Sequence, residues 1–261
     1  MSRFSACGSQ SFSALLQGPR ERKERKDAFL PMHPLIQQAT THHRNLLEPE
    51  AWEVLNAYGI ETPPFRWARS PREAKQLATH FPFPQVLKVV SPDILHKTEV
   101  GGVVLGLRDE NEVEAAFEAM EQKIRRTLPE ADLRGALLCP QMQPGRELIL
   151  GKVEDPQIGS VLMLGLGGIF AELLGDVVFR KTPLSAFDAK EMIGDLKFHD
   201  VFKGVRGSGP LDLEALVRTL LAFSRLVEEN PAIKECDLNP ILLYEKGLCA
   251  VDARMLLSFS E

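Results

Sequence analysis

Residues 86–102 read V-L-K-V-V-S-P-D-I-L-H-K-T-E-V-G-G, and the organisation of the chain is best followed outward from this stretch. Its first five residues are apolar except for Lys88, a pattern that predicts a short buried strand with one inward cation. Because an unpaired ammonium is costly to bury, Lys88 needs an anionic partner, either a carboxylate or a phosphate. The sequence therefore predicts a charged site at this strand.

The residues after the strand predict a loop suited to phosphate. Pro92 turns the chain, His96 follows, and the pair Gly101-Gly102 lets the backbone approach a ligand closely or form a tight turn. A lysine on a strand, a histidine on the next loop and glycines beyond it are typical of phosphate handling. A structural lysine with a surface histidine is the alternative, and these residues alone do not decide between the two.

Composition excludes several classes of protein. The 261 residues are 44% hydrophobic and 26% charged, which is ordinary for a globular protein, and the net charge of −5 argues against a nucleic-acid partner. No apolar run approaches the roughly 18 residues that span a bilayer. The cysteines form no C-x-x-C pair, which fits buried free thiols in a reducing cytoplasm.

Residues 1–45 are expected to be an N-terminal extension with little order. The first 31 residues show no apolar periodicity, and residues 20–26 form the charge run R-E-R-K-E-R-K. A solvated tail accounts for this run better than a nucleic-acid arm, and the acids at Glu21 and Glu24 argue against a transit peptide. Met32 is a candidate for the true start of the protein.

From residue 46 onward the pattern predicts mixed helices and strands. Helices are expected over 50–58, 70–81, 109–128, 186–196 and 213–229, with Ser70 and Asp109 as N-caps. Strands are expected over 86–90, 102–107, 136–142, 147–153, 161–164, 177–181, 241–244 and 248–253. This mixture, with a break near residues 130–136, predicts two α+β lobes, 46–135 and 136–261.

Two glycine-rich segments resemble nucleotide-binding motifs, but each lacks a glycine that its motif requires. In Gly165-Leu-Gly-Gly-Ile-Phe170 a phenylalanine occupies the third glycine of the dinucleotide fingerprint. In residues 175–182, G-D-V-V-F-R-K-T, Arg180 stands where a P-loop requires its second glycine, and the run is a predicted strand. A nucleotide would therefore have to be bound by another scheme.

The C-terminal segment Asp237-Leu-Asn239-Pro240 suggests a metal site. Pro240 favours an extended Asn239, and Asp252, at the far end of a predicted hairpin, can return opposite it. Mg²⁺ is commonly held by a few protein oxygens together with water and nucleotide phosphates. The alternative is an asparagine turn and an ordinary aspartate at a strand end.

Taken together, these segments resemble the ATP-grasp (β) subunit of ADP-forming acyl-CoA synthetases (acetate–CoA ligase, ADP-forming), relatives of succinyl-CoA synthetase β. The resemblance covers residues 46–258. It is carried in order by V-L-K-V-V-S-P-D-I-L-H-K-T-E-V-G-G-V, Q-M-Q-P-G-R-E-L-I-L-G, M-L-G-L-G-G-I-F-A-E-L-L-G-D-V-V-F-R, D-L-N-P and V-D-A-R. The resemblance implies an α+β ATP-grasp fold that holds ATP or ADP between two lobes.

The resemblance also implies roles for single residues. Lys88 matches the strand lysine that contacts ATP phosphates, and His96 matches a histidine that passes a phosphoryl group from a partner's phosphohistidine to ADP. Asn239 and Asp252 match the Mg²⁺ ligands, with Asp237 close by.

Further nucleotide contacts follow from the same resemblance. Gln141 and Met142 match the interlobe hinge that meets adenine, and Glu147 lies on the strand after it. Arg180 is a candidate phosphate contact, and Gly101 and Gly102 are candidate contacts on the loop that carries His96.

A partner is implied as well. The chain shows neither the CoA-binding domain nor the second catalytic histidine domain of fused family members, so activity should require a CoA-binding α subunit that carries the other histidine, in a heterotetramer. Two other functions stay open: a free-standing ATP-grasp carboxylate ligase that forms an acyl phosphate directly, and a non-catalytic nucleotide-binding regulatory subunit.

Overall fold

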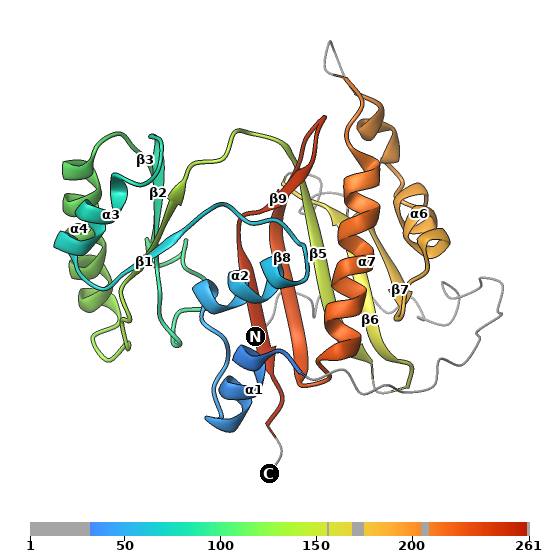
Figure 1. Cartoon of the computed structure of the whole chain (residues 1–261), viewed down its shortest axis with the longest axis horizontal. Helices are drawn as coiled ribbons and strands as arrows, with labels where there is room; N and C mark the ends of the chain where they lie inside the picture. The colour runs from blue at the N-terminus through green and yellow to red at the C-terminus, as the bar shows by residue number, and fades with distance from the viewer. Residues whose placement is uncertain (1–31, 156, 169–174, 205–208, 260–261) are drawn as a thin grey trace. The chain divides into compact units, whose positions relative to one another are not determined.

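Two antiparallel sheets organise the part of the chain that this computed structural model describes, residues 32–155, 157–168, 175–204 and 209–259. The small sheet has the order β1 (Arg66–Ala68), β4 (Ala136–Pro140), β2 (Gln85–Val89), β3 (Val103–Leu107). The large sheet has the order β10 (Ala253–Leu257), β8 (Ile233–Leu243), β5 (Arg146–Asp155), β6 (Gly159–Leu166), β7 (Val177–Lys181), and β9 (Leu248–Ala250) pairs with β8. Figure 1 shows the two sheets joined by the chain that leads from β4 to β5.

Helices α3 (Pro71–Ala78) and α4 (Glu110–Thr127) cover one face of the small sheet (Figure 1). Their apolar residues pack with Leu87 and Val89 of β2 in one buried cluster. Because side chains alternate along a strand, Lys88 points to the other face, away from these helices. Both helices begin at the predicted caps, since Ser70 accepts from the Glu73 N–H and Asp109 from the Asn111 N–H.

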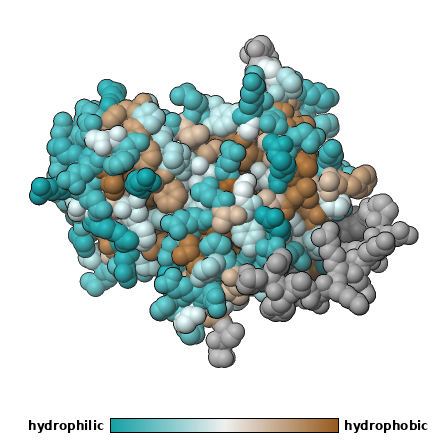
Figure 2. Space-filling view, viewed as in Figure 1, coloured by the Kyte–Doolittle hydropathy of each residue, from teal (hydrophilic) through white to brown (hydrophobic). Residues whose placement is uncertain are grey.

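Helices α6 (Ala186–Gly194) and α7 (Leu213–Glu229) cover the large sheet, and the short helix η3 (His199–Lys203) lies between them in sequence. Leucines of α7 join alternate residues of the large sheet, such as Leu150 and Leu238, in the main core. Hydrophilic side chains cover much of the face drawn in Figure 2, with apolar side chains showing between them. Among the described helices, none is long and apolar enough to cross a membrane.

The predicted extension over 1–45 is too long. Residues 1–31 lie outside the described part, but α1 (Pro34–Thr41) is a helix that buries Ile36 and Ala39 completely in the main core. The backbone N–H of His33 also donates to the Asn230 side chain at 2.8 Å. The fold therefore begins before residue 46.

The predicted boundary between the lobes is also misplaced. Strand β4 belongs to the small sheet, because it pairs with both β1 and β2. Helix α2 (Glu48–Ala57) packs against β10 and joins the main core of the large sheet. The small lobe is therefore residues 66–140, and the chain enters the large lobe both before and after it.

Candidate functional site

Lys88 lies at the centre of a buried ion-pair cluster. Its Nζ donates to Glu48 Oε1 at 2.8 Å and to the Val251 carbonyl, and it lies 5.0 Å from the centre of the Trp52 ring. The side chains of Lys88 and Glu48 are 8% and 3% exposed. The expectation that a buried Lys88 needs an anion is confirmed, and the anion is a carboxylate from the first residue of α2.

A second lysine and a second carboxylate complete the cluster. Lys97 Nζ donates to Asp252 Oδ1 at 3.0 Å and lies 3.1 Å from Glu48 Oε2, while Lys88 Nζ lies 3.9 Å from Asp252 Oδ1. The four residues come from α2, β2, the 91–102 loop and the segment between β9 and β10. We call Glu48, Lys88, Lys97 and Asp252 the charge cluster.

Burial and mutual attraction set the protonation of the charge cluster. Burial and the Asp252 carboxylate raise the pKa of Glu48 to about 7, against the pull of both lysines. Burial alone would raise the pKa of Asp252, but Lys88 and Lys97 outweigh it and hold that pKa below its ordinary range. At neutral pH Asp252 is therefore ionised, and Glu48 is the member whose charge is held least firmly.

Asp237 and Asn239 lie beside this cluster in the middle of β8. The Asn239 N–H donates to the Asp252 carbonyl at 3.3 Å, which confirms that Asp252 returns opposite Asn239. Burial raises the pKa of Asp237 to about 6; Arg254 and His96 pull it down, and Asp252 and Glu235 push it up. His96, Asp237 and Asp252 thus lie within electrostatic reach of one another.

The residues present fit a divalent cation. Asp237 Oδ1 is buried and accepts no hydrogen bond from the described residues, and Asp252 and the exposed Asn239 add further oxygens. A buried carboxylate with an unsatisfied oxygen and a raised pKa is stabilised by a bound cation. No group of three or more His, Cys, Asp or Glu residues with metal-site geometry occurs in the described ranges, so the amide of Asn239 and ligand oxygens would have to complete the coordination.

The predicted hinge residues lie between the two sheets. Gln141 Oε1 accepts from the Gly106 N–H at 2.7 Å, which ties the hinge to β3, and Met142 follows it with its side chain partly exposed. Glu147, near the start of β5, is exposed, and its carbonyl accepts from the Gly167 N–H at 2.8 Å. These positions suit a ligand held between the lobes.

Gly101 and Gly102 serve the loop itself. Gly101 has φ +71°, and a Cβ on Gly102 would collide with the Val89 side chain. Their N–H groups donate to the carbonyls of Thr98 and Lys97, so neither is available to a phosphate. Of the two roles expected for this pair, the structure shows the tight turn.

Arg180 does not lie with the other predicted residues. It pairs in register with Leu162 and forms an ion pair with Asp195 at the end of α6, on the helix-covered face of the large sheet. Asp237 pairs with Gly151, one residue out of step, and therefore faces the opposite side. The expected phosphate contact through Arg180 has no support in this geometry.

Sequence reasoning missed Glu48 and Lys97. Glu48 looks like an ordinary acid in a first helical turn, and only tertiary contacts show that it is buried. Lys97 directly follows His96 in the sequence, and a second cation beside the histidine is a usable signal of a charged site. The need of Lys88 for a carboxylate predicted that such a residue exists without saying which.

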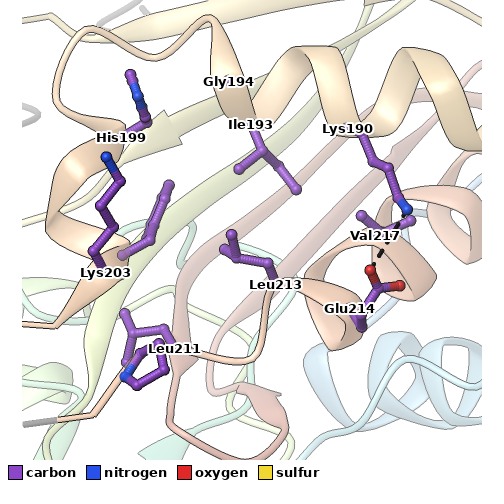
Figure 3. Close-up of a pocket in the computed structure, with 11 residues that line it drawn as sticks. Lys190, Ile193, Gly194, His199, Lys203, Leu211, Leu213, Glu214 and Val217 are labelled. Carbon is purple, nitrogen blue, oxygen red and sulfur yellow. Dashed lines mark ion pairs between the residues drawn. The ribbon is translucent and has the colours of Figure 1, made fainter.

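A separate cavity of about 360 Å³ lies between α6, η3 and the start of α7. Figure 3 shows apolar walls from Ile193, Leu211 and Leu213, with His199 and Lys203 at one end and the Lys190–Glu214 ion pair at the other. None of the predicted site residues lines it. The cavity is therefore separate from the residues that the sequence singles out.

The two sheets and the charged site between them are those of an ATP-grasp protein, and the family model described as ATP-grasp domain matches residues 37–257. The chain is 43% identical over 231 residues to the acetate–CoA ligase [ADP-forming] I subunit beta of Pyrococcus furiosus, covering 88% of this chain and all of that protein. It is 41% identical over 208 residues to acetate–CoA ligase [ADP-forming] I of Archaeoglobus fulgidus, covering 80% of this chain and 30% of that protein.

Solved structures agree with these relatives. The acetyl-coenzyme A synthetase 1 of Ca. Korarchaeum cryptofilum, described as dinucleotide forming and solved with coenzyme A and Ca-AMPCP, superposes with a TM-score of 0.83 at 42% identity, over 86% of this chain and 98% of that chain. Another structure of that enzyme, with Mg-AMPPCP, has a TM-score of 0.75 at 40% identity over the same shares of the two chains. The chain belongs to the ATP-grasp family, and within it to the β subunits of ADP-forming acetate–CoA ligases.

Proposed function

We propose that this chain is the nucleotide-binding subunit of an ADP-forming acyl-CoA synthetase and relays phosphate through His96. The overall reaction is acid + ATP + CoA = acyl-CoA + ADP + phosphate. The observation that carries the proposal is the convergence of Lys88, Asp252, Asp237 and the His96 loop at one place between the lobes. Such a site offers cations to phosphate and carboxylates to Mg²⁺.

The residues divide the chemistry between them. Lys88 neutralises phosphate charge from a position fixed by its burial. Asp237, Asn239 and Asp252 would hold Mg²⁺, which would supply further charge neutralisation. Gln141, Met142 and Glu147 contact the rest of the nucleotide from the hinge side. His96 is exposed, so its imidazole is accessible to a phosphoryl donor from another subunit.

The relay has two displacement steps. In the first, a neutral nitrogen of His96 attacks the phosphorus of the partner's phosphohistidine, and the bond from phosphorus to the partner's nitrogen breaks. In the second, a terminal phosphate oxygen of ADP attacks the phosphorus on His96, the nitrogen leaves, and ATP forms. The reverse order uses ATP to drive acyl-CoA formation.

The partner is a CoA-binding α subunit that carries the other catalytic histidine, in a heterotetramer. The proposal is supported by the chain's match to all of the Pyrococcus protein, which is itself named as one subunit, and to 30% of the longer Archaeoglobus protein. One Korarchaeum structure is described as having its phosphohistidine segment pointing towards the nucleotide-binding site, as a relay requires of that protein.

Phosphoryl labelling tests this function. The purified chain is incubated with Mg²⁺ and ATP labelled at its γ-phosphate, with and without the α partner, and acid-labile label is mapped by peptide mass. We expect label on His96, lost in His96→Asn and retained in the control His80→Asn, an exposed histidine of the small lobe. In a parallel mixture that also contains the carboxylic acid, acyl phosphate formation that survives His96→Asn would indicate a direct ligase. No label in any mixture would indicate a binding subunit.

A further inference from the structure

Lys97 is the residue of the 91–102 loop that anchors the neighbourhood of His96 to the large lobe. Leu95 and His96 are exposed, whereas the next side chain, Lys97, is 12% exposed and turns inward. Its Nζ donates to Asp252 Oδ1 at 3.0 Å and lies 3.1 Å from Glu48 Oε2. Both partners lie outside the small sheet, so this side chain links the His96 loop to the opposite side of the site.

We infer that Lys97 is a positioning residue for His96: its ammonium holds the loop against Asp252 and is displaced when a divalent cation takes that carboxylate. This inference rests on the proposed function, because it takes Asp252 as a metal ligand. Metal binding and the freedom of the phosphate-carrying loop would then be coupled through one side chain.

Competition between Lys97 and a metal follows from the distances. Asp252 Oδ1 already accepts from Lys97 and from the Ala253 N–H at 2.9 Å. A divalent cation on the Asp252 carboxylate would share that group with the Lys97 ammonium, 3.0 Å from its Oδ1, and the two positive charges repel. A cation bound at either oxygen of Asp252 therefore weakens the hold of this carboxylate on Lys97 and favours displacement of the lysine.

One ion pair of Lys97 is left after displacement, its 3.1 Å contact with Glu48 Oε2. Glu48 Oε2 faces Lys97 without hydrogen-bond geometry, and the other oxygen of this carboxylate is bound by Lys88. The backbone turn closed by the Gly102 N–H on the Lys97 carbonyl at 2.7 Å is unaffected. The loop therefore keeps its turn while its side-chain tether loses the hydrogen bond to Asp252, which gives the adjacent His96 more freedom.

Metal affinity is the first test. The full chain without nucleotide is titrated with Mn²⁺, and free ion is counted by electron paramagnetic resonance. We expect Lys97→Met to bind Mn²⁺ about fivefold tighter than the unaltered chain, since a competing cation is gone, and Lys97→Arg to behave like the unaltered chain. Lys75→Met, which removes an ion pair with Glu114 outside the cluster, is the matched control and should change nothing.

Two results distinguish a failure of this inference from a failure of the proposed metal site on which it rests. Asp252→Asn should abolish the Mn²⁺ binding, and unchanged binding in that variant would overturn the proposed metal site. If Asp252→Asn loses the metal but Lys97→Met binds it no more tightly, the metal site stands and the inference fails.

Hydrogen exchange of the peptide covering residues 91–102 is the second test. In the unaltered chain, saturating Mn²⁺ should speed exchange of this peptide about fivefold, a comparison that needs no variant. In Lys97→Met exchange should be fast with and without metal, and Lys75→Met should respond like the unaltered chain. A peptide that stays equally protected in Lys97→Met, or that ignores bound metal in the unaltered chain, would contradict the proposal.

Discussion

At the scale of single residues, the site depends on charges that are buried together. Lys88 and Glu48 are each almost inaccessible to solvent, and each is tolerable there because the other is present. Lys97 and Asp252 likewise compensate each other's charge, and they lie on the more exposed side of the site. Substitutions of these residues should therefore affect both stability and ligand binding, and the two effects can be separated.

Lys88→Met should lower the free energy of unfolding by about 3 kcal/mol, because it leaves the buried Glu48 without its hydrogen-bonded cation. The double variant Lys88→Met/Glu48→Gln should recover most of that loss but none of the nucleotide affinity. Urea unfolding and calorimetric titration with ADP measure the two quantities. A double variant that regained ADP binding would remove Lys88 from the phosphate site.

Asp237 makes stability depend on pH. Its pKa in the folded chain, about 6, lies above the ordinary value of 3.8, so ionisation costs stability as the pH rises from about 4 to about 6. Asp237→Asn should therefore be more stable than the unaltered chain by about 1–3 kcal/mol at pH 7 without metal, and equally stable at pH 3.5. Saturating Mg²⁺ should reduce the difference at pH 7, and an advantage that stays constant across pH would contradict this account.

At the scale of elements, local signals predicted helices well and the C-terminal strands poorly. The caps Ser70 and Asp109 begin α3 and α4 as expected, because capping depends on side chains within a few residues. The hairpin of β8 and β9 is confirmed, but β8 begins at Ile233, eight residues before the expected strand. Residues 235–239, E-C-D-L-N, do alternate polar and apolar as a half-buried strand does, but Asp237, Asn239 and Pro240 have low strand propensity and argue against a strand.

Helix α1 shows the same limit at the other end of the chain. Its eight residues have only Ile36 and Ala39 fully buried, too few for a periodic signal, yet both lie in the main core. Ile36→Ala should lower the free energy of unfolding by about 2–4 kcal/mol, whereas Gln37→Ala, at an exposed position of the same helix, should leave it nearly unchanged. Equal unfolding midpoints in urea for the two variants would show that α1 is not part of the cooperative core.

At the scale of the whole molecule, the site is assembled from segments about 200 residues apart. The sequence predicted Lys88, His96, Asn239 and Asp252 individually, and the structure brings Lys88, Asn239 and Asp252 together with the loop that bears His96. The sequence alone could not predict that Glu48, on a helix before the small lobe, belongs to the site. Nor could it predict that Arg180 lies on the other face of the large sheet, away from the site. Long-range contacts of this kind depend on topology, which local patterns do not encode.

The proposal that this chain and an α partner carry different parts of the reaction gives a prediction for the whole molecule. The purified chain should bind Mg-ADP by itself but form no acyl-CoA from acid, ATP and CoA until the α partner is added. A coupled assay of thioester formation, with and without the partner, measures this directly. Thioester formation by the chain alone would favour a free-standing ligase.

The most direct measurement of the central claim is the anomalous signal of Mn²⁺ in crystals of the chain grown with Mn²⁺ and a non-hydrolysable ATP analogue. The account predicts a peak about 2.0–2.3 Å from oxygens of Asn239 and Asp252, with the analogue's terminal phosphate against Lys88 and facing His96. A metal and nucleotide bound elsewhere, for example in the cavity beside α6 and α7, would contradict it.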